Sequence, residues 1–214
     1  MITDAETNTV FLSLGLKQSF PVLEKRLSEI LLNDGITLKG INNTENIRCA
    51  DLMPLQVNNE SFVEFTNNSS GYVNTNAQPL ITEKLPFETN RSNLILDKSS
   101  VVKGKNKVIV TEKFYLDNIS MDKITVNTLL KELLEINEVI CIPIPASTLN
   151  NQAESVVRFL DDRTVLLAEI RDDSDFFQLR VEEIFKRHRI EIILLPDFKQ
   201  SKFEQKKEAP VLEN

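Results

Sequence analysis

The sequence predicts an α/β protein in which short strands alternate with helices that each carry one apolar face. Three segments have apolar residues gathered on one side of a helix, which is the pattern of a helix packed on one face. Six short runs between and around them are rich in β-branched and aromatic residues. A unit of two strands, a helix and a further strand can be traced twice, which indicates a repetitive architecture.

The three helices differ in how clearly the sequence marks their ends. The first is expected to follow Ser19-Phe20-Pro21, which offers a candidate cap and a proline in the first turn, and to stop at Gly35. The second is expected to begin near Met121-Asp122 and the third near Asp173-Ser174. A one-sided apolar stripe indicates packing against a flat surface, so all three helices are expected to pack on sheets. The stripes are Leu23, Leu27, Ile30 and Leu31, then Val126, Leu129, Leu130, Leu133 and Leu134, then Phe177, Val181, Ile184 and Phe185.

The predicted strands supply these sheets. They are Thr9–Leu12, Ser61–Phe65, Lys107–Val110, Val139–Ile142, Thr164–Leu167 and Ile190–Leu195. Two of them follow a turn and an earlier strand, Ser100–Lys103 in one case and Val156–Leu160 in the other, so that each forms a hairpin. A helix and another strand follow each hairpin, which completes the β-β-α-β unit. The N-terminal strand, the first helix and Ile36–Ile41 resemble the same unit without its opening strand.

Composition suggests one domain, over residues 1–196, followed by a polar tail over residues 197–214. Residues 66–93 are rich in Asn, Ser and Thr and are expected to form a polar excursion within that domain. Six asparagines fall between Asn58 and Asn76. This composition is more typical of a solvated loop than of a recognition segment.

Charge and hydropathy exclude several classes of partner. A formal charge of −7 argues against nucleic acid and against an anionic membrane. The basic run Lys186–Arg189 falls where a helix should end, a place that favours cations. No segment approaches the ~18 apolar residues of a membrane span, and the N-terminus has no signal-peptide core. Cys49 and Cys141 therefore suggest reduced thiols in a cytoplasmic protein. No cofactor is expected.

The two cysteines have different surroundings in the sequence. Cys141 lies within an apolar run, which indicates a packing role. Cys49 has no histidine near it in the sequence, so a nucleophilic role is not favoured for it.

Three segments resemble motifs of the agmatine deiminase and peptidylarginine deiminase family. Asn43–Gln56 is similar to a stretch that ends in Arg-Asp-Tyr-Met-Pro-x-Gln, and Asn93–Gly104 is similar to Leu-Asp-Gly-Gly-Asn-Val-Val. Asn151–Leu166 is similar to Gly-His-x-Asp-x-x-Val-Arg-Phe-x-Asp-x-x-Thr-Val-Leu. The resemblance covers residues 1–196. It implies the pentein fold, a five-bladed α/β propeller of β-β-α-β units with helices outside, of which about three units are expected here.

The resemblance also implies a chemistry in which a cysteine thiolate attacks a guanidinium carbon. A histidine moves protons, and two carboxylates hold the cation. The first carboxylate matches Asp51, although Asp51 could instead cap a turn before Leu-Met-Pro. The family's paired glycines and Asn are replaced by Lys98, Ser99 and Ser100, which places side chains where backbone would approach a ligand.

The remaining catalytic positions are changed as well. The proton-carrying histidine is replaced by Gln152, whose amide has no useful pKa. The second carboxylate is Glu154, one methylene longer than the family's Asp, and the family's C-terminal cysteine has no counterpart in these residues. The only histidine, His188, is expected at a solvent-facing helix end. The chain is therefore expected not to be an enzyme.

Two functions remain open from the sequence. The chain is expected to be a binding or structural subunit that uses the missing propeller sector as an interface, filled by a protein partner or a second copy. An open ring would expose strand edges and apolar helix faces, which proteins usually cover. Alternatively, the chain is a sensor that binds a guanidino compound through Asp51 and Glu154 without turnover.

Overall fold

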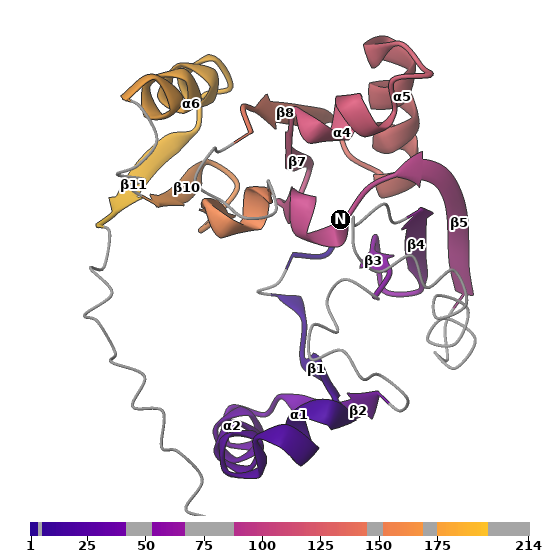
Figure 1. Cartoon of the computed structure of the whole chain (residues 1–214), viewed down its shortest axis with the longest axis vertical. Helices are drawn as coiled ribbons and strands as arrows, with labels where there is room; N and C mark the ends of the chain where they lie inside the picture. Colours follow the sequence, from indigo (N-terminus) through magenta and orange to yellow (C-terminus); the bar gives the residue numbers. More distant parts are fainter. Residues whose placement is uncertain (4–5, 42–52, 67–87, 145–151, 169–174, 197–214) are drawn as a thin grey trace, which may run out of the picture.

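The computed structural model describes residues 1–3, 6–41, 53–66, 88–144, 152–168 and 175–196. In these residues the chain forms four small sheets that follow one another in chain order, with helices on the outside (Figure 1). The first sheet has two strands, β1 (Thr9–Ser13) and β2 (Thr37–Ile41). Each of the other three sheets has three strands.

The three-stranded sheets share one topology. Their strands are β3 (Leu55–Gln56), β4 (Ser61–Thr66) and β5 (Glu88–Ile95), then β6 (Val101–Lys103), β7 (Lys107–Thr111) and β8 (Glu138–Ile142), then β9 (Val157–Phe159), β10 (Thr164–Ala168) and β11 (Glu191–Leu195). In each, the first strand is antiparallel and the last is parallel to the middle strand. The parallel pair β1–β2 matches the last two strands of such a sheet. This confirms the predicted repeat.

One sheet of the described residues was not foreseen as a sheet. The β3–β4–β5 sheet was anticipated only as a single strand at Ser61–Phe65, whereas β6–β7–β8 and β9–β10–β11 belong to the two predicted units and β1–β2 to the partial one. The polar excursion expected over residues 66–93 is also shorter, since Thr66 ends β4 and β5 begins at Glu88. The β5 sequence is mostly polar, and its strand form comes from parallel pairing with β4, which no local propensity records.

The two long helices in the second half of the chain were predicted correctly, whereas the predicted first helix differs from the structure. Helix α5 (Lys123–Leu134) is capped by Asp122, whose Oδ1 accepts from two backbone N–H groups at 2.9 and 3.0 Å. Helix α6 spans Asp175–Arg187, and α4 (Lys113–Asp117) was not foreseen.

The predicted first helix is two helices, α1 (Leu14–Ser19) and α2 (Pro21–Asn33). Ser19 ends α1, and Phe20 occupies the N-cap position of α2 without a side-chain hydrogen bond. The expected cap is therefore wrong. Gly35, with φ of +72°, closes the helix as expected.

Two hydrophobic cores hold the last three sheets together, the first with α4 and α5 and the second with α6. In the first core, α5 packs with residues of β4, β5 and β7, so it lies against its own sheet and the preceding one. In the second core, α6 packs with β7, β8 and β10 in the same way. The β7 strand serves both cores, because Val108 and Val110 face the first and Ile109 faces the second.

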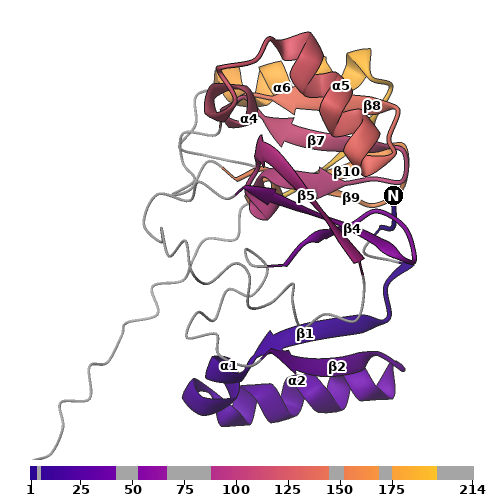
Figure 2. The same cartoon turned by 90° about the vertical axis from the view of Figure 1, so that its right-hand side faces the viewer.

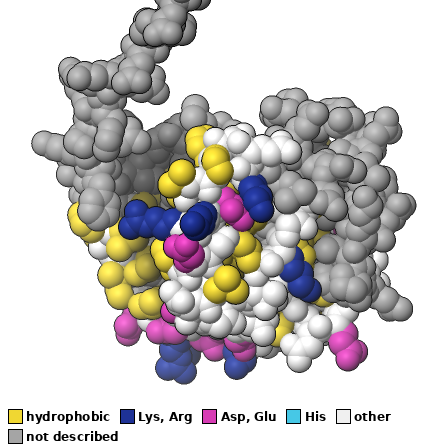
Figure 3. Space-filling view, turned by 90° about the horizontal axis from the view of Figure 1, so that it is seen from below, with side chains coloured by type: hydrophobic (Ala, Val, Ile, Leu, Met, Phe, Trp, Pro, Cys, Tyr) yellow, Lys and Arg dark blue, Asp and Glu magenta, His cyan; other side chains and the backbone are white. Residues whose placement is uncertain are grey.

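Helix α2 departs from this arrangement. It lies with α1 beside the β1–β2 sheet, at the end of the molecule opposite α5 and α6 (Figure 2). It contacts β2, as expected of a helix packed on a sheet, but none of its residues is buried. Hydrophobic side chains are exposed on this side of the molecule (Figure 3). None of the helices in the described segments is long and apolar enough to cross a membrane.

Candidate functional site

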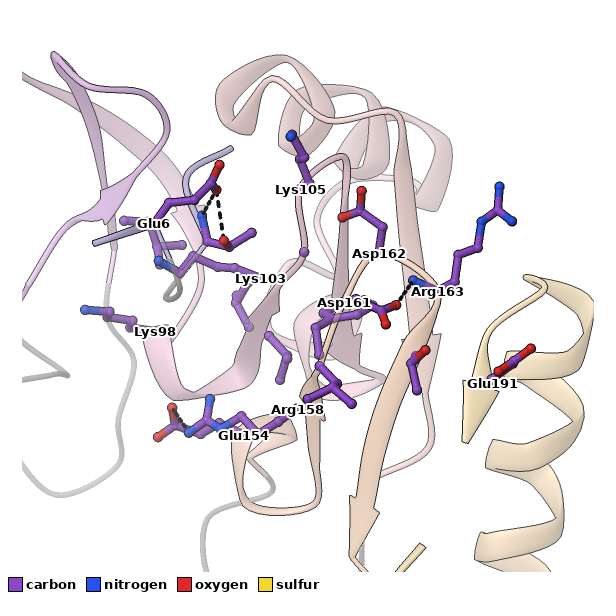
Figure 4. Close-up of a pocket in the computed structure, with 18 residues that line it drawn as sticks. Glu6, Lys98, Lys103, Lys105, Glu154, Arg158, Asp161, Asp162, Arg163 and Glu191 are labelled. Atoms are coloured by element: carbon purple, nitrogen blue, oxygen red, sulfur yellow. Dashed lines mark hydrogen bonds and ion pairs between the residues drawn. The ribbon is translucent and has the colours of Figure 1, made fainter. Parts of the chain in front are cut away.

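Two short 3-10 turns bring two of the three motif segments together. The turn Lys98–Ser100 precedes β6, and the turn Ala153–Ser155 precedes β9. The two turns are in contact, although more than fifty residues separate them in the chain. Lys98 and Glu154 both line one cavity of about 730 Å³ (Figure 4). Asp51 and Cys49 lie outside the described residues.

The walls of this cavity come from five parts of the chain, including Leu55 of β3 and Glu191 of β11. Thr3 and Glu6 contribute from the N-terminus, Val101–Lys105 from β6 and its turn, and Arg158–Thr164 from β9 and the turn to β10. The lining carries equal numbers of basic and acidic side chains (Figure 4): Lys98, Lys103, Lys105, Arg158 and Arg163, and Glu6, Glu154, Asp161, Asp162 and Glu191. The cavity therefore has no strong preference for one sign of charge. Most of these residues were not singled out in the sequence.

The Glu154 carboxylate already has a guanidinium partner. Nη2 of Arg158 lies 3.2 Å from Oε2 of Glu154. Both side chains are partly exposed, at 49% for Arg158 and 28% for Glu154. The carboxylate expected to clamp a guanidino ligand is therefore held by a guanidinium of the same chain, in the charge-assisted manner that such a ligand would use.

Two of the predicted site residues do not reach the cavity. Ser99 and Ser100 are buried, with exposed fractions of 1% and 3%, and neither contributes to the lining. Their hydroxyls, together with Oδ1 of Asp97, have no hydrogen-bond partner among the described residues. The other oxygen of Asp97 lies 3.5 Å from Nζ of Lys113. Of the three substituted positions, only Lys98 alters the cavity wall directly.

Gly104 shapes the cavity in a way that the sequence did not single out. A Cβ atom built at this position would lie 3.1 Å from Cε2 of Phe159 and 3.2 Å from the Lys107 carbonyl oxygen. The backbone N–H of Gly104 donates to that same carbonyl at 2.8 Å. A glycine at the hairpin turn therefore allows β6 and β9 to approach closely.

The sequence matches no protein-family model and no curated protein. Solved structures do resemble it. Campylobacter jejuni agmatine deiminase matches with a TM-score of 0.69 and 18% identity, over 93% of this chain and 73% of that one. A structure provisionally assigned as a peptidyl-arginine deiminase matches with 0.65 and 14%, over 92% and 75%. The agmatine deiminase of Enterococcus faecalis matches with 0.61 and 19%, over 88% and 57%. The chain has the deiminase fold.

Gln152 is the residue that the motif resemblance matches to the family's histidine. Gln152 is half-buried and immediately precedes the Ala153–Ser155 turn. Its carbonyl oxygen accepts a 2.7 Å hydrogen bond from the Ser155 hydroxyl. An amide neither gains nor loses a proton near neutral pH, so this position offers no general base.

The one histidine of the chain has a structural partner away from the cavity. Nδ1 of His188 lies 2.7 Å from Oε1 of Glu138, and Nζ of Lys107 lies 3.4 Å from the other carboxylate oxygen. Partial burial raises the pKa of the Glu138 carboxyl, but the hydrogen bond and charge of His188, together with Lys107, lower it below its usual value. His188 follows the end of α6 as expected, but its side chain is only 31% exposed, because it ties the end of α6 to β8.

The Cys141 thiol is unsuited to nucleophilic attack. Cys141 is half-buried beside the first core, where desolvation raises the pKa of its thiol to about 11, with a further contribution from the nearby Glu112 carboxylate. A thiol with this pKa is almost fully protonated at neutral pH, and the thiolate is the reactive form. Its position agrees with the expected packing role. Within the described ranges, no group of three or more His, Cys, Asp or Glu residues could hold a metal ion.

Proposed function

We propose that this chain is a catalytically inactive protein of the deiminase fold that works as a binding or structural subunit in the cytoplasm. The observation that carries the proposal is the set of residues at the positions that the resemblance assigns to the site. Where guanidine hydrolysis needs a proton carrier, the chain has Gln152, and the adjacent Glu154 carboxylate is paired with Arg158. Lys98 adds a positive charge to a wall that would have to accept a cationic substrate.

The architecture supports an interface as the functional part. In the proposed five-bladed propeller, the four sheets of the described residues would take four sectors, and the first and last sheets would flank the fifth. Most of the exposed large hydrophobic side chains belong to these two ends: Phe20, Val22, Leu23, Ile30 and Leu32 at the first, and Leu160, Phe176, Leu179, Ile193, Leu194 and Leu195 at the last. Clustered apolar exposure of this kind is typical of a protein-binding surface.

A second function, a sensor for a guanidino compound, is favoured by the cavity itself. A volume of about 730 Å³ is within the range of small-molecule sites, and Glu154 lines it. For this function, a ligand would have to displace Arg158 from Glu154. The two functions therefore make opposite predictions for agmatine binding.

The proposal is tested first by activity. The purified chain is incubated with agmatine and with a peptidyl-arginine mimic, and the ureido product is measured by colorimetry. We expect no product above the level of a buffer control. Turnover that is lost in Cys49→Ala or His188→Ala would contradict the proposal.

Calorimetry separates the two functions. We expect no saturable heat when agmatine is titrated into the wild-type chain. The variant Arg158→Ala releases the Glu154 carboxylate, and Arg163→Ala serves as a matched control that removes a cavity arginine but leaves the Glu154 pair intact. Saturable binding to the wild type that disappears in Asp51→Ala or Glu154→Ala would establish the sensor.

A further inference from the structure

Two apolar faces of this chain are exposed, although their counterparts elsewhere in the same chain are buried. The first face is the stripe of α2. Three stripes share the spacing i, i+4 and i+8: Leu23, Leu27 and Leu31 in α2, Val126, Leu130 and Leu134 in α5, and Phe177, Val181 and Phe185 in α6. These residues of α5 and α6 are at most 7% exposed, whereas none of the α2 leucines is buried: Leu23 is 56% exposed, and Leu27 and Leu31 are half-buried. Ile30, on the same side of α2, is 51% exposed.

The second face is the outer face of the last sheet. By the register of the parallel pairs, Leu166, Ile193 and Leu195 of β10–β11 stand where Ile109, Ile140 and Ile142 stand in β7–β8. The three isoleucines have exposed fractions of 0%. In contrast, Ile193 is 45% and Leu195 41% exposed.

These two faces reproduce the two sides of a contact that the chain makes internally. In the second core, the stripe of α6 packs with Ile109, Ile140 and Ile142, so the helix of one unit covers the outer face of the preceding sheet. Helix α2 offers the same kind of stripe, and it has the 13-residue length of α6. The outer face of β10–β11 offers the same kind of surface. Helix and sheet face lie at opposite ends of the series of sheets (Figure 1).

We propose that α2 of one copy packs on the outer face of β10–β11 of a second copy. Each α2–sheet contact joins two different surfaces, and the pair closes with two-fold symmetry when the second copy's α2 also packs on the first copy's sheet, which makes the whole interface isologous. Burial of both apolar faces drives the association. This inference deepens the proposed function and rests on its premise that the chain acts through an interface.

The experiment uses the 214-residue chain and two charge-introducing variants, one on each face. Leu23→Glu disrupts the helix face and Ile193→Glu the sheet face. Leu116→Glu, on α4, is the matched control, because Leu116 is 60% exposed and belongs to neither face. Mass is measured by size-exclusion chromatography with light scattering, and circular dichroism establishes that each variant is folded.

We expect the wild type and the control to associate and each face variant alone to be monomeric. An equimolar mixture of the two face variants should form a 1:1 pair, because the intact α2 of one meets the intact sheet of the other. A monomeric wild type, association that survives both variants, or a mixture that fails to pair would overturn the inference. If either face variant is unfolded, Ile30→Lys and Leu195→Lys replace them with the same expected pairing.

The outcomes distinguish this inference from the proposed function. A monomeric wild type that binds a different protein would overturn the second-copy contact and leave the binding-subunit function in place. A chain that self-associates through these faces but releases a ureido product would overturn the proposed inactive function and leave the second-copy contact in place.

Discussion

Substitution of one leucine in each of two apolar stripes measures how far each stripe is buried. Leu130→Ala in α5 and Leu23→Ala in α2 remove the same atoms from stripes of the same spacing. Leu130 is fully buried in the first core, with an exposed fraction of 0%, so its truncation removes transfer free energy and leaves a cavity. Large-to-small substitutions of this kind cost about 2–5 kcal/mol.

Leu23→Ala should lower the free energy of unfolding of the monomer much less. Less than half of its side chain is buried, since 56% is exposed. Full burial of a leucine contributes roughly 1.5–3 kcal/mol, so the partial burial of Leu23 accounts for about 1 kcal/mol or less, with no closed cavity left behind. The two variants should therefore differ by at least ~1–2 kcal/mol in the free energy of unfolding.

The assay is urea denaturation followed by circular dichroism at low protein concentration, analysed by linear extrapolation. We expect Leu130→Ala to lower the midpoint strongly and Leu23→Ala only slightly, with an unchanged slope for both. Equal losses at the lowest concentration would refute the reasoning, because α2 would then be buried within a single chain.

Three further predictions follow from polar groups. Asn118→Ala removes a buried amide that donates to the Ile95 carbonyl and accepts from its N–H, at 2.8 and 2.9 Å, and should destabilise the fold by about 2–4 kcal/mol in the same urea assay; no loss would contradict this role. Because the folded state lowers the pKa of Glu138, its contribution is present above the ordinary value of 4.5 and is lost as the pH falls through the folded-state pKa. Glu138→Gln should therefore reduce the loss of stability that the wild type shows as the pH falls through this range. An unchanged loss would contradict the contribution assigned to Glu138. In a Cys49→Ser background, Cys141 should resist iodoacetamide at pH 8 and react once urea unfolds the chain, because its thiol pKa is about 11; rapid labelling of the native protein would contradict this.

The polar part of the site shows the limit of sequence reasoning most clearly. The motif segments correctly placed Lys98 and Glu154 close together, because the repeated unit puts each segment at the start of a hairpin. The same segments suggested that Ser99 and Ser100 faced a ligand, yet both are buried away from the cavity. Which way a side chain points from a one-turn 3-10 helix depends on the neighbours packed around it.

Periodicity by itself determined α5, α6 and the order of strands in the repeat, because the spacing of apolar residues reflects the face that a local segment must bury. It could not determine whether a partner for that face exists, and α2 and α5 carry the same spacing with opposite burial. Only the tertiary structure decided that β5 pairs with β4 and that His188 lies beside Glu138, fifty residues away. Each of these depends on groups brought together by packing, and no local pattern specifies which distant group will be there.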